Sequence, residues 1–228
     1  MDTRTTQTNL EPYLIVIPVY DGVDLMDIAA PREIFGWLES DTSFNRCVRV
    51  LYIGDDQKKT FVTNNGVEIA MDAGFQDKDV QHPNLIWVPG GRPEALAIIL
   101  NDEYSLFTAY VKRTGANADW VCSVCEGAIL LANTGLLDGH NITTHWAFVN
   151  CFKKFPKVTV VAGHPRYVKS GNRITGGGIS SGLDEALYLV ELIAGTSSAV
   201  AIQQTMQYYP DPPVKSSIPE AAAVKFLD

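Results

Sequence analysis

Short apolar, β-branched runs recur along the chain and alternate with stretches of helical pattern. The runs span Tyr13–Val19, Val48–Ile53, Leu85–Val88 and Trp120–Val124. Strands that are buried on both faces appear in a sequence as continuous apolar runs, so this alternation predicts a mostly parallel sheet with helices packed on both faces. The expected fold class is a doubly wound α/β domain.

Between the strands we expect helices at Ile34–Leu38 after Pro31, at Glu103–Lys112 and at Gly127–Leu137. The first turn of the first of these helices is expected to contain Pro31. Asp138-Gly139 is a turn signal and ends the third helix.

The strongest helical pattern lies near the C-terminus. Apolar residues at helical spacing predict one buried stripe, formed by Leu183, Ala186, Leu187, Val190 and Ile193. Asp184, Glu185 and Glu191 are predicted on the opposite, solvated face, and Gly195 is predicted to close the helix.

The last third of the chain also carries a hairpin pattern and a proline-rich end. A β-rich stretch, Val158–Thr175, predicts a hairpin with its turn at Lys169–Asn172. Three prolines within Tyr208–Pro213 exclude regular helix or central strand, because each removes a backbone donor and fixes φ. We therefore expect a single domain, residues 1–207, followed by an extended arm, residues 208–228.

Composition restricts the possible functions. The chain has 228 residues, of which 46% are hydrophobic and 19% charged, and its formal net charge is −8. This acidic excess argues against nucleic acid or anionic lipid as a partner, since both require clustered Lys and Arg. No apolar run approaches the roughly 18 residues of a membrane span, and the first residues lack the layout of a signal peptide. We expect a cytoplasmic protein that binds a small molecule.

The four cysteines are too few for a disulfide scaffold and are expected to be free thiols. Cys122 and Cys125 form a C-x-x-C motif, but no second pair of ligands follows at the spacing of a zinc site. The spacing therefore predicts no metal site, and Cys122 is expected to be a core residue.

The segment Trp120–Ala128 is the most informative for chemistry. A buried strand ends at Val124 and a helix begins by Gly127, which places Cys125 on a sharp strand-to-helix turn. Such a turn is a nucleophile elbow, and it requires small residues behind the nucleophile. The N-terminus of the following helix is expected to lower the pKa of the thiol. The local sequence is equally compatible with an inert buried thiol.

Other candidate groups follow neighbouring strands at the same sheet edge. Pro89-Gly90-Gly91 either turns backbone amides toward a ligand or forms a simple turn. Asp24 or Asp27 is expected to reach this edge, and apolar neighbours would raise the pKa of Asp27 and suit it to proton transfer. The alternative role of Asp27 is a helix cap. His145 is either a partner of the cysteine or a core residue.

Taken together, seven segments in the same order resemble the ThiJ/PfpI superfamily, and within it the isocyanide hydratase branch. They are Met26–Pro31, Val88–Gly91, Ser123–Ala128, Gly135–Gly139, Thr143–Trp146, Thr175–Ile179 and Gln207–Pro213. The resemblance implies a flavodoxin-like sandwich, a homodimer, and no metal or organic cofactor.

In the hydratase branch, the resemblance implies that the thiolate of Cys125 attacks the carbon of an isonitrile and forms a thioimidate. Asp27 then relays a proton and positions water, which releases the N-substituted formamide. Gly91, Glu126 and Ile179 are the implied substrate-binding residues.

One position departs from this pattern, because the hydratases have threonine directly after the nucleophile where this chain has Glu126. A carboxylate there should raise the pKa of Cys125. It can also stabilise the helix start by about 0.3–1 kcal/mol through the helix dipole.

Two other functions remain open at this point: a glyoxalase or deglycase acting on small carbonyls, and a non-enzymatic cysteine that senses redox state or a ligand. The ligand-sensing half of an AraC-type regulator is not expected, because the chain carries no basic DNA-binding module.

Overall fold

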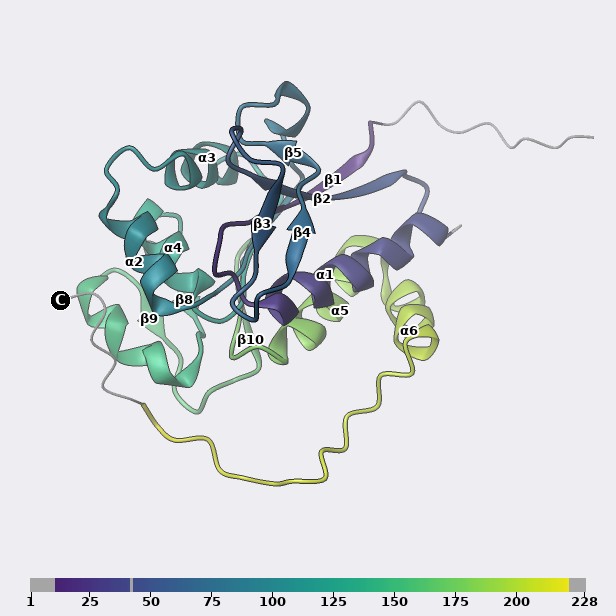
Figure 1. The fold of residues 1–228 in the computed structure, drawn as a ribbon. Coiled ribbons are helices and arrows are strands. Elements are labelled where there is room, and N and C mark those ends of the chain that lie inside the picture. Colours follow the sequence, from purple (N-terminus) through teal and green to yellow (C-terminus); the bar gives the residue numbers. More distant parts are fainter. Residues whose placement is uncertain (1–10, 42, 222–228) are drawn as a thin grey trace, which may run out of the picture.

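The four apolar runs of the sequence form four adjacent strands at the centre of one sheet. The computed structural model, which describes residues 11–41 and 43–221, places them in the order β7-β6-β1-β2 (Figure 1). Their bounds are Tyr13–Pro18 for β1, Val48–Gly54 for β2, Leu85–Val88 for β6 and Trp120–Ser123 for β7. Each neighbouring pair runs parallel, which confirms the prediction from the continuous apolar pattern.

Three further strands bring this sheet to seven within the described residues. β5 (Ala73–Gly74) extends it beyond β2, and β11 (Arg173–Gly176) pairs in parallel with β7. β10 (Tyr167–Ser170) joins β11 antiparallel, which confirms the predicted hairpin and its turn. Outside the main sheet, β3 (Thr60–Val62) pairs with β4 (Glu68–Ala70), and β8 (Asn141–Ile142) pairs with β9 (Thr159–Val160). The predicted β-rich stretch is therefore divided between two sheets.

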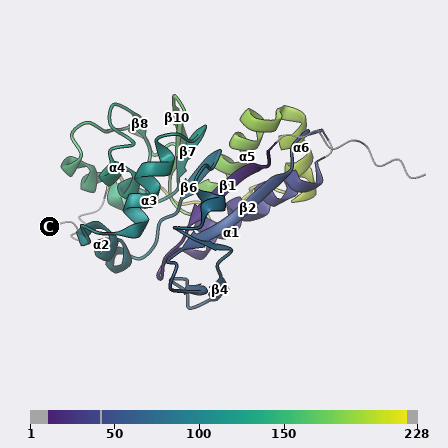
Figure 2. The ribbon, with the colours of Figure 1, turned by 90° about the horizontal axis from the view of Figure 1, so that it is seen from above.

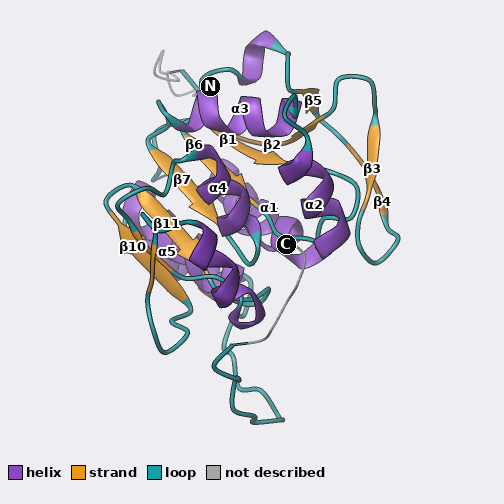
Figure 3. Cartoon of the chain, turned by 90° about the vertical axis from the view of Figure 1, so that its left-hand side faces the viewer, coloured by secondary structure: helices purple, strands orange, loops and turns teal. Residues whose placement is uncertain are grey.

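Helices cover both faces of the main sheet, as Figures 2 and 3 show. One face carries α1 (Leu25–Gly36) and α5 (Ser181–Ala194), and α6 (Thr196–Thr205) packs on α5. The other face carries α2 (Pro93–Asn101), α3 (Leu106–Gly115) and α4 (Gly127–Thr134). Short 3-10 helices lie in the connections: η1 (Trp37–Ser40), η2 (Lys78–Val80) and η3 (Trp146–Lys154). The fold is the predicted doubly wound α/β sandwich, with one apolar core on each face of the sheet.

The described helices include none that is both long enough and apolar enough to cross a membrane. After α6, the described residues as far as 221 form neither helix nor strand (Figure 1). The division into a domain of residues 1–207 and an arm of residues 208–228 stays a prediction, and the end of that arm lies outside the described residues.

The expected start of the first helix was wrong. α1 begins at Leu25, so Pro31 lies inside the helix, where it is buried. A proline inside a helix lacks the N–H that would bond the carbonyl four residues earlier, here that of Asp27. The indole Nε1 of Trp87 on β6 donates to this carbonyl at 2.9 Å. The unpaired group is thus satisfied by the sheet, and the same hydrogen bond fixes α1 against β6.

Two other helices also differ from expectation. α2 was not predicted, although Pro93 stands in its first turn. The helix predicted at Glu103–Lys112 begins only at Leu106, because the Ser105 side chain caps it by accepting a hydrogen bond from the Thr108 amide.

α5 is rotated about its axis relative to the prediction. Its innermost residues are Glu185, Ala186, Leu189 and Val190, each fully buried, whereas Leu183 and Leu187 are only half-buried. Placing Glu185 on the solvated face was therefore wrong. Its carboxyl lies against Gly176 of β11, where there is no side chain, and neither of its oxygens has a hydrogen-bond partner within the described chain. Burial raises the pKa of Glu185 well above its usual range.

Replacing Trp87 with Phe tests the role of the indole N–H. The substitution leaves the Asp27 carbonyl buried without a donor, so we expect the free energy of unfolding to fall by about 1–3 kcal/mol. The matched control is Trp37→Phe, which removes an indole N–H bonded to Glu33 at the exposed end of the same helix and should change stability by less than about 0.5 kcal/mol. Urea denaturation of both variants gives the comparison, and equal losses would contradict this role.

Candidate functional site

Cys125 lies on the strand-to-helix turn between β7 and α4, as the sequence predicted. Its φ is +59°, a left-handed conformation that is strained for a residue other than glycine and typical of a nucleophile elbow. The turn is held from both sides, because the Cys125 amide donates to the Gly177 carbonyl at 2.8 Å and its carbonyl accepts from Thr144 Oγ1 at 2.8 Å. Gly127 is required behind it, since a Cβ at that position would collide with the Val88 carbonyl oxygen.

The thiol of Cys125 is surrounded by acids. One ligand atom from each of Asp24, Asp27, Cys125 and Glu126 lies within 4.8 Å of the others. Cys125, Asp27 and Glu126 are buried, and Asp24 is half-buried. Both aspartates after the first strand therefore reach the sheet edge, where the sequence had predicted one of them.

Asp27 occupies the first turn of α1 and does not cap the helix. Its Oδ2 accepts a hydrogen bond from the Gly90 amide at 2.9 Å, and its Oδ1 has no partner among the described residues. Burial raises the pKa of Asp27 well above its usual range, and the nearby carboxyls of Glu126 and Asp24 raise it further, against the opposing effect of the Gly90 amide. The raised pKa favours the protonated form of Asp27, which can donate a proton.

Glu126 stands at the N-cap position of α4, but its side chain makes no capping hydrogen bond. The carboxyl lies instead against Gly90 and the Cys125 thiol. Burial raises the pKa of Glu126 to about 7, and the hydrogen bond with the Cys125 thiol and the amides of Glu126 and Gly91 limit the rise. Glu126 thus exchanges its proton close to neutral pH, a property that a general acid or base requires.

The expectation that the helix N-terminus lowers the pKa of Cys125 was wrong. Burial raises the pKa of this thiol well above its usual range, and Asp27 and Glu126 raise it further. The amide of Ile179 has the opposite effect, because it faces the sulfur. Glu126 raises the pKa of Cys125, as the sequence predicted from its negative charge. The resting group is a thiol whose proton must be removed before it can react.

The three residues proposed for substrate binding occupy different positions. The carboxyl of Glu126 and the backbone amide of Ile179 both face the sulfur. The backbone φ of Ile179 is +21°, and this residue is 42% exposed. Ile179 also lines a groove of about 470 Å³ together with Met26 and Leu183. Gly91 acts on the sulfur only indirectly, because its amide faces the carboxyl of Glu126. The backbone donors of the glycine turn therefore hold the two acids.

Of the two alternatives left open for His145, a partner of the cysteine or a core residue, the first is not what the structure shows. His145 is not among the groups that shift the pKa of Cys125; its Nδ1 accepts a hydrogen bond from the Ala147 amide at 3.3 Å and caps η3.

Tyr20 was not predicted as a site residue, yet its hydroxyl donates a hydrogen bond to the Pro89 carbonyl at 3.2 Å. Burial raises the pKa of Tyr20, with Glu126 as the next largest cause. Its position directly after the first strand was the signal that could have identified it.

This geometry can be compared with that of known proteins. The sequence pattern of the DJ-1/PfpI family matches residues 14–192. The chain belongs to the DJ-1/PfpI family. It is 33% identical over 210 residues to isonitrile hydratase from Pseudomonas putida, an overlap that covers 92% of this chain and 85% of that protein. Membership of the DJ-1/PfpI family confirms the resemblance inferred from the seven sequence segments.

Solved structures show the same fold. A THiJ/PfpI family protein from Pseudomonas syringae superimposes with a TM-score of 0.78 at 26% identity, covering 94% of this chain and 84% of that chain. Drosophila melanogaster DJ-1beta superimposes with a TM-score of 0.71 at 17% identity, covering 88% of this chain and all of that chain. The second similarity shows the fold alone, a DJ-1-like α/β sandwich.

Glu126→Gln tests the electrostatics of the site. The substitution removes the carboxylate that raises the pKa of Cys125, so the thiolate should form at lower pH. We expect the pH profile for alkylation of Cys125 by iodoacetamide to move to lower pH, with a several-fold faster reaction near pH 7.5.

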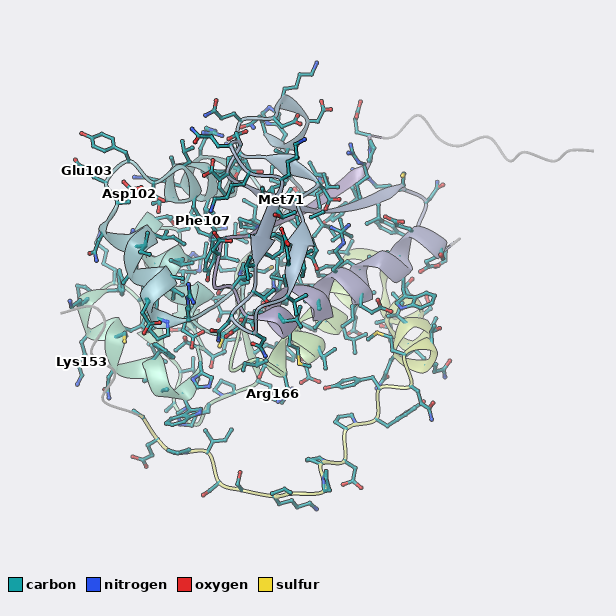
Figure 4. All side chains as sticks on the ribbon, in the orientation of Figure 1. Met71, Asp102, Glu103, Phe107, Lys153 and Arg166 are labelled. Atoms are coloured by element: carbon teal, nitrogen blue, oxygen red, sulfur yellow. The ribbon has the colours of Figure 1, made fainter. Side chains whose placement is uncertain are left out.

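Glu103→Gln is the matched control, because Glu103 is exposed on the connection between α2 and α3, at the outer edge of the molecule (Figure 4). Its alkylation profile should coincide with that of the wild type. A Glu126→Gln profile that is unchanged or moved to higher pH would show that the carboxyl does not act on the thiol.

Proposed function

We propose that this protein is a cysteine-dependent hydratase that converts an isonitrile to the N-substituted formamide. The observation that carries the proposal is the position of Cys125 on its elbow between Asp27, whose pKa burial raises, and Glu126, whose pKa is raised to about 7. The similarity to isonitrile hydratase over most of both chains supports it.

The first step joins Cys125 to the substrate. The Glu126 carboxylate, which accepts a hydrogen bond from the thiol, removes its proton as the sulfur attacks the terminal carbon of R–N≡C. Asp27 donates its proton to the same carbon. The product is a thioimidate, R–N=CH–S–Cys125, with Asp27 ionised and Glu126 protonated. The Ile179 amide, which faces the sulfur, stabilises negative charge there.

The second step releases the product. Asp27, now ionised, takes a proton from water as the oxygen attacks the thioimidate carbon, and Glu126 protonates the nitrogen. The resulting hydroxyl then loses its proton through Glu126 to the departing sulfur. The C–S bond breaks, R–NH–CHO leaves, and the thiol and both acids return to their original protonation states.

The surroundings of the sulfur indicate which substrates fit best. The groove beside Ile179 is lined mainly by apolar side chains, Leu25, Met26, Ala29, Leu183 and Met206 among them. Apolar walls favour an apolar R group by removing its surface from water. A role as redox sensor has less support, because such sensors use exposed thiolates of low pKa, and Cys125 is buried with a raised pKa.

Turnover of cyclohexyl isocyanide to its formamide tests the proposal. We expect the wild type to form N-cyclohexylformamide and Cys125→Ser to form none, because a serine hydroxyl is a poor nucleophile without a strong base. Cys47→Ser, which changes an exposed thiol, is the matched control and should keep full activity. Asp27→Asn should remain open to alkylation at Cys125 yet not turn over. Formamide production by Cys125→Ser would exclude the covalent mechanism, and its absence in the wild type would exclude this substrate class.

A further inference from the structure

The four groups at the site form a set of donors suited to a metal ion. A thiol and three carboxyls offer one sulfur and three oxygens that lie within 4.8 Å of one another. They come from two places that the fold brings together, the start of α1 with Asp24 and Asp27, and the elbow with Cys125 and Glu126. Cysteine spacing could not indicate such a site, since only one of the four ligands is a cysteine.

A second observation concerns the unpaired oxygens in this cluster. Asp27 Oδ1 and Glu126 Oε2 are both buried and both lack a hydrogen-bond partner among the described residues. Asp27 is fully buried and Glu126 is 5% exposed. Most buried polar atoms in proteins are hydrogen-bonded, so two unpaired acceptors beside one thiol require a physical reason. A cation bound between them would satisfy both.

The donor set selects the kind of cation. Mg²⁺ and Ca²⁺ require six or more oxygen ligands and do not favour sulfur. A tetrahedral site of one thiolate and three carboxylate oxygens matches the ligand types and the coordination number of Zn²⁺. Ligands about 2.0–2.3 Å from such an ion lie roughly 3.3–3.8 Å apart, so side-chain shifts of about 1 Å complete the geometry.

We propose that Asp24, Asp27, Cys125 and Glu126 form a binding site for Zn²⁺, and that zinc reversibly blocks the nucleophile. A Zn–S bond forms as the S–H bond breaks, Asp27 gives up its proton as its oxygen binds the ion, and both protons pass to solvent. Asp24 is half-buried at the edge of the groove, which gives the ion a route to the buried ligands. One of its oxygens accepts a hydrogen bond from Asn64 at 3.0 Å, and the other remains for the metal. The proposal rests on this geometry and not on the isonitrile reaction.

Cobalt provides a direct test, because Co²⁺ replaces Zn²⁺ in tetrahedral sites and a cobalt–thiolate bond absorbs in the near ultraviolet. Titration of the wild type with CoCl₂ should give this absorption with one equivalent bound, and ZnCl₂ should remove it. MgCl₂ should not compete. Cys125→Ser should lose the thiolate band, and Glu126→Gln should bind cobalt at least about tenfold more weakly, since even an outer-shell partner typically contributes that much.

Cys47→Ser, which removes an exposed thiol outside the cluster, is the matched control and should keep the full spectrum. A band that persists in Cys125→Ser, or none in the wild type, would overturn the proposal. Zinc should also protect Cys125 from iodoacetamide until a chelator is added, and Glu126→Gln should need at least about tenfold more zinc for the same protection. Alkylation that proceeds unchanged in saturating zinc would equally overturn it. Neither measurement involves isonitrile turnover, so each can fail independently of the proposed reaction.

Discussion

The candidate site depends on how α1 is attached to the end of β6. Pro31 cannot donate to the Asp27 carbonyl, and Trp87 on β6 donates to it instead. Two residues beyond that strand, the Gly90 amide binds the Asp27 carboxyl. The same strand end supports the elbow, because the Val88 carbonyl accepts from the Val124 amide at 3.1 Å and lies directly against Gly127. β6 therefore sets the position of the acid and of the nucleophile together.

Burial then decides the protonation of the groups that this arrangement brings together. Three carboxyls and a thiol in a small, mostly buried volume cannot all be ionised, because each charge is poorly solvated and repels the others. The result is a coupled set in which the pKa values of Asp27 and Cys125 rise well above their usual ranges and that of Glu126 rises to about 7. A proton-transfer reaction and a divalent cation both make use of such a set.

Much of the architecture could be predicted from the sequence. Strands buried on both faces leave an unambiguous apolar pattern, and the combination of strand end, cysteine and Gly127 defined the elbow. The family followed from short motifs in a fixed order and is confirmed over residues 14–192. Asp27 was identified by its apolar neighbours in the sequence, and it is fully buried.

The remaining features depend on contacts that local pattern does not contain. Pro31 was placed in the first turn of its helix because the Trp87 indole that makes a proline further inside the helix tolerable lies 56 positions away in the chain. Glu185 was placed in solvent because a charged residue on a helix is usually exposed, whereas here Gly176 leaves space for its carboxyl, whose pKa burial raises. The pKa of Cys125 was expected to follow the helix dipole, but burial and two acids outweigh that effect.

Cys125 rests as a thiol beside an acid whose pKa is about 7. The most direct measurement is an NMR titration of the protein labelled with ¹³C at cysteine Cβ and glutamate Cδ. We expect the Cys125 signal to keep its thiol position through pH 8, while the Glu126 signal titrates with a pKa of about 7. A Cys125 signal at the thiolate position at pH 7, with Glu126 ionised down to its ordinary pKa, would contradict it.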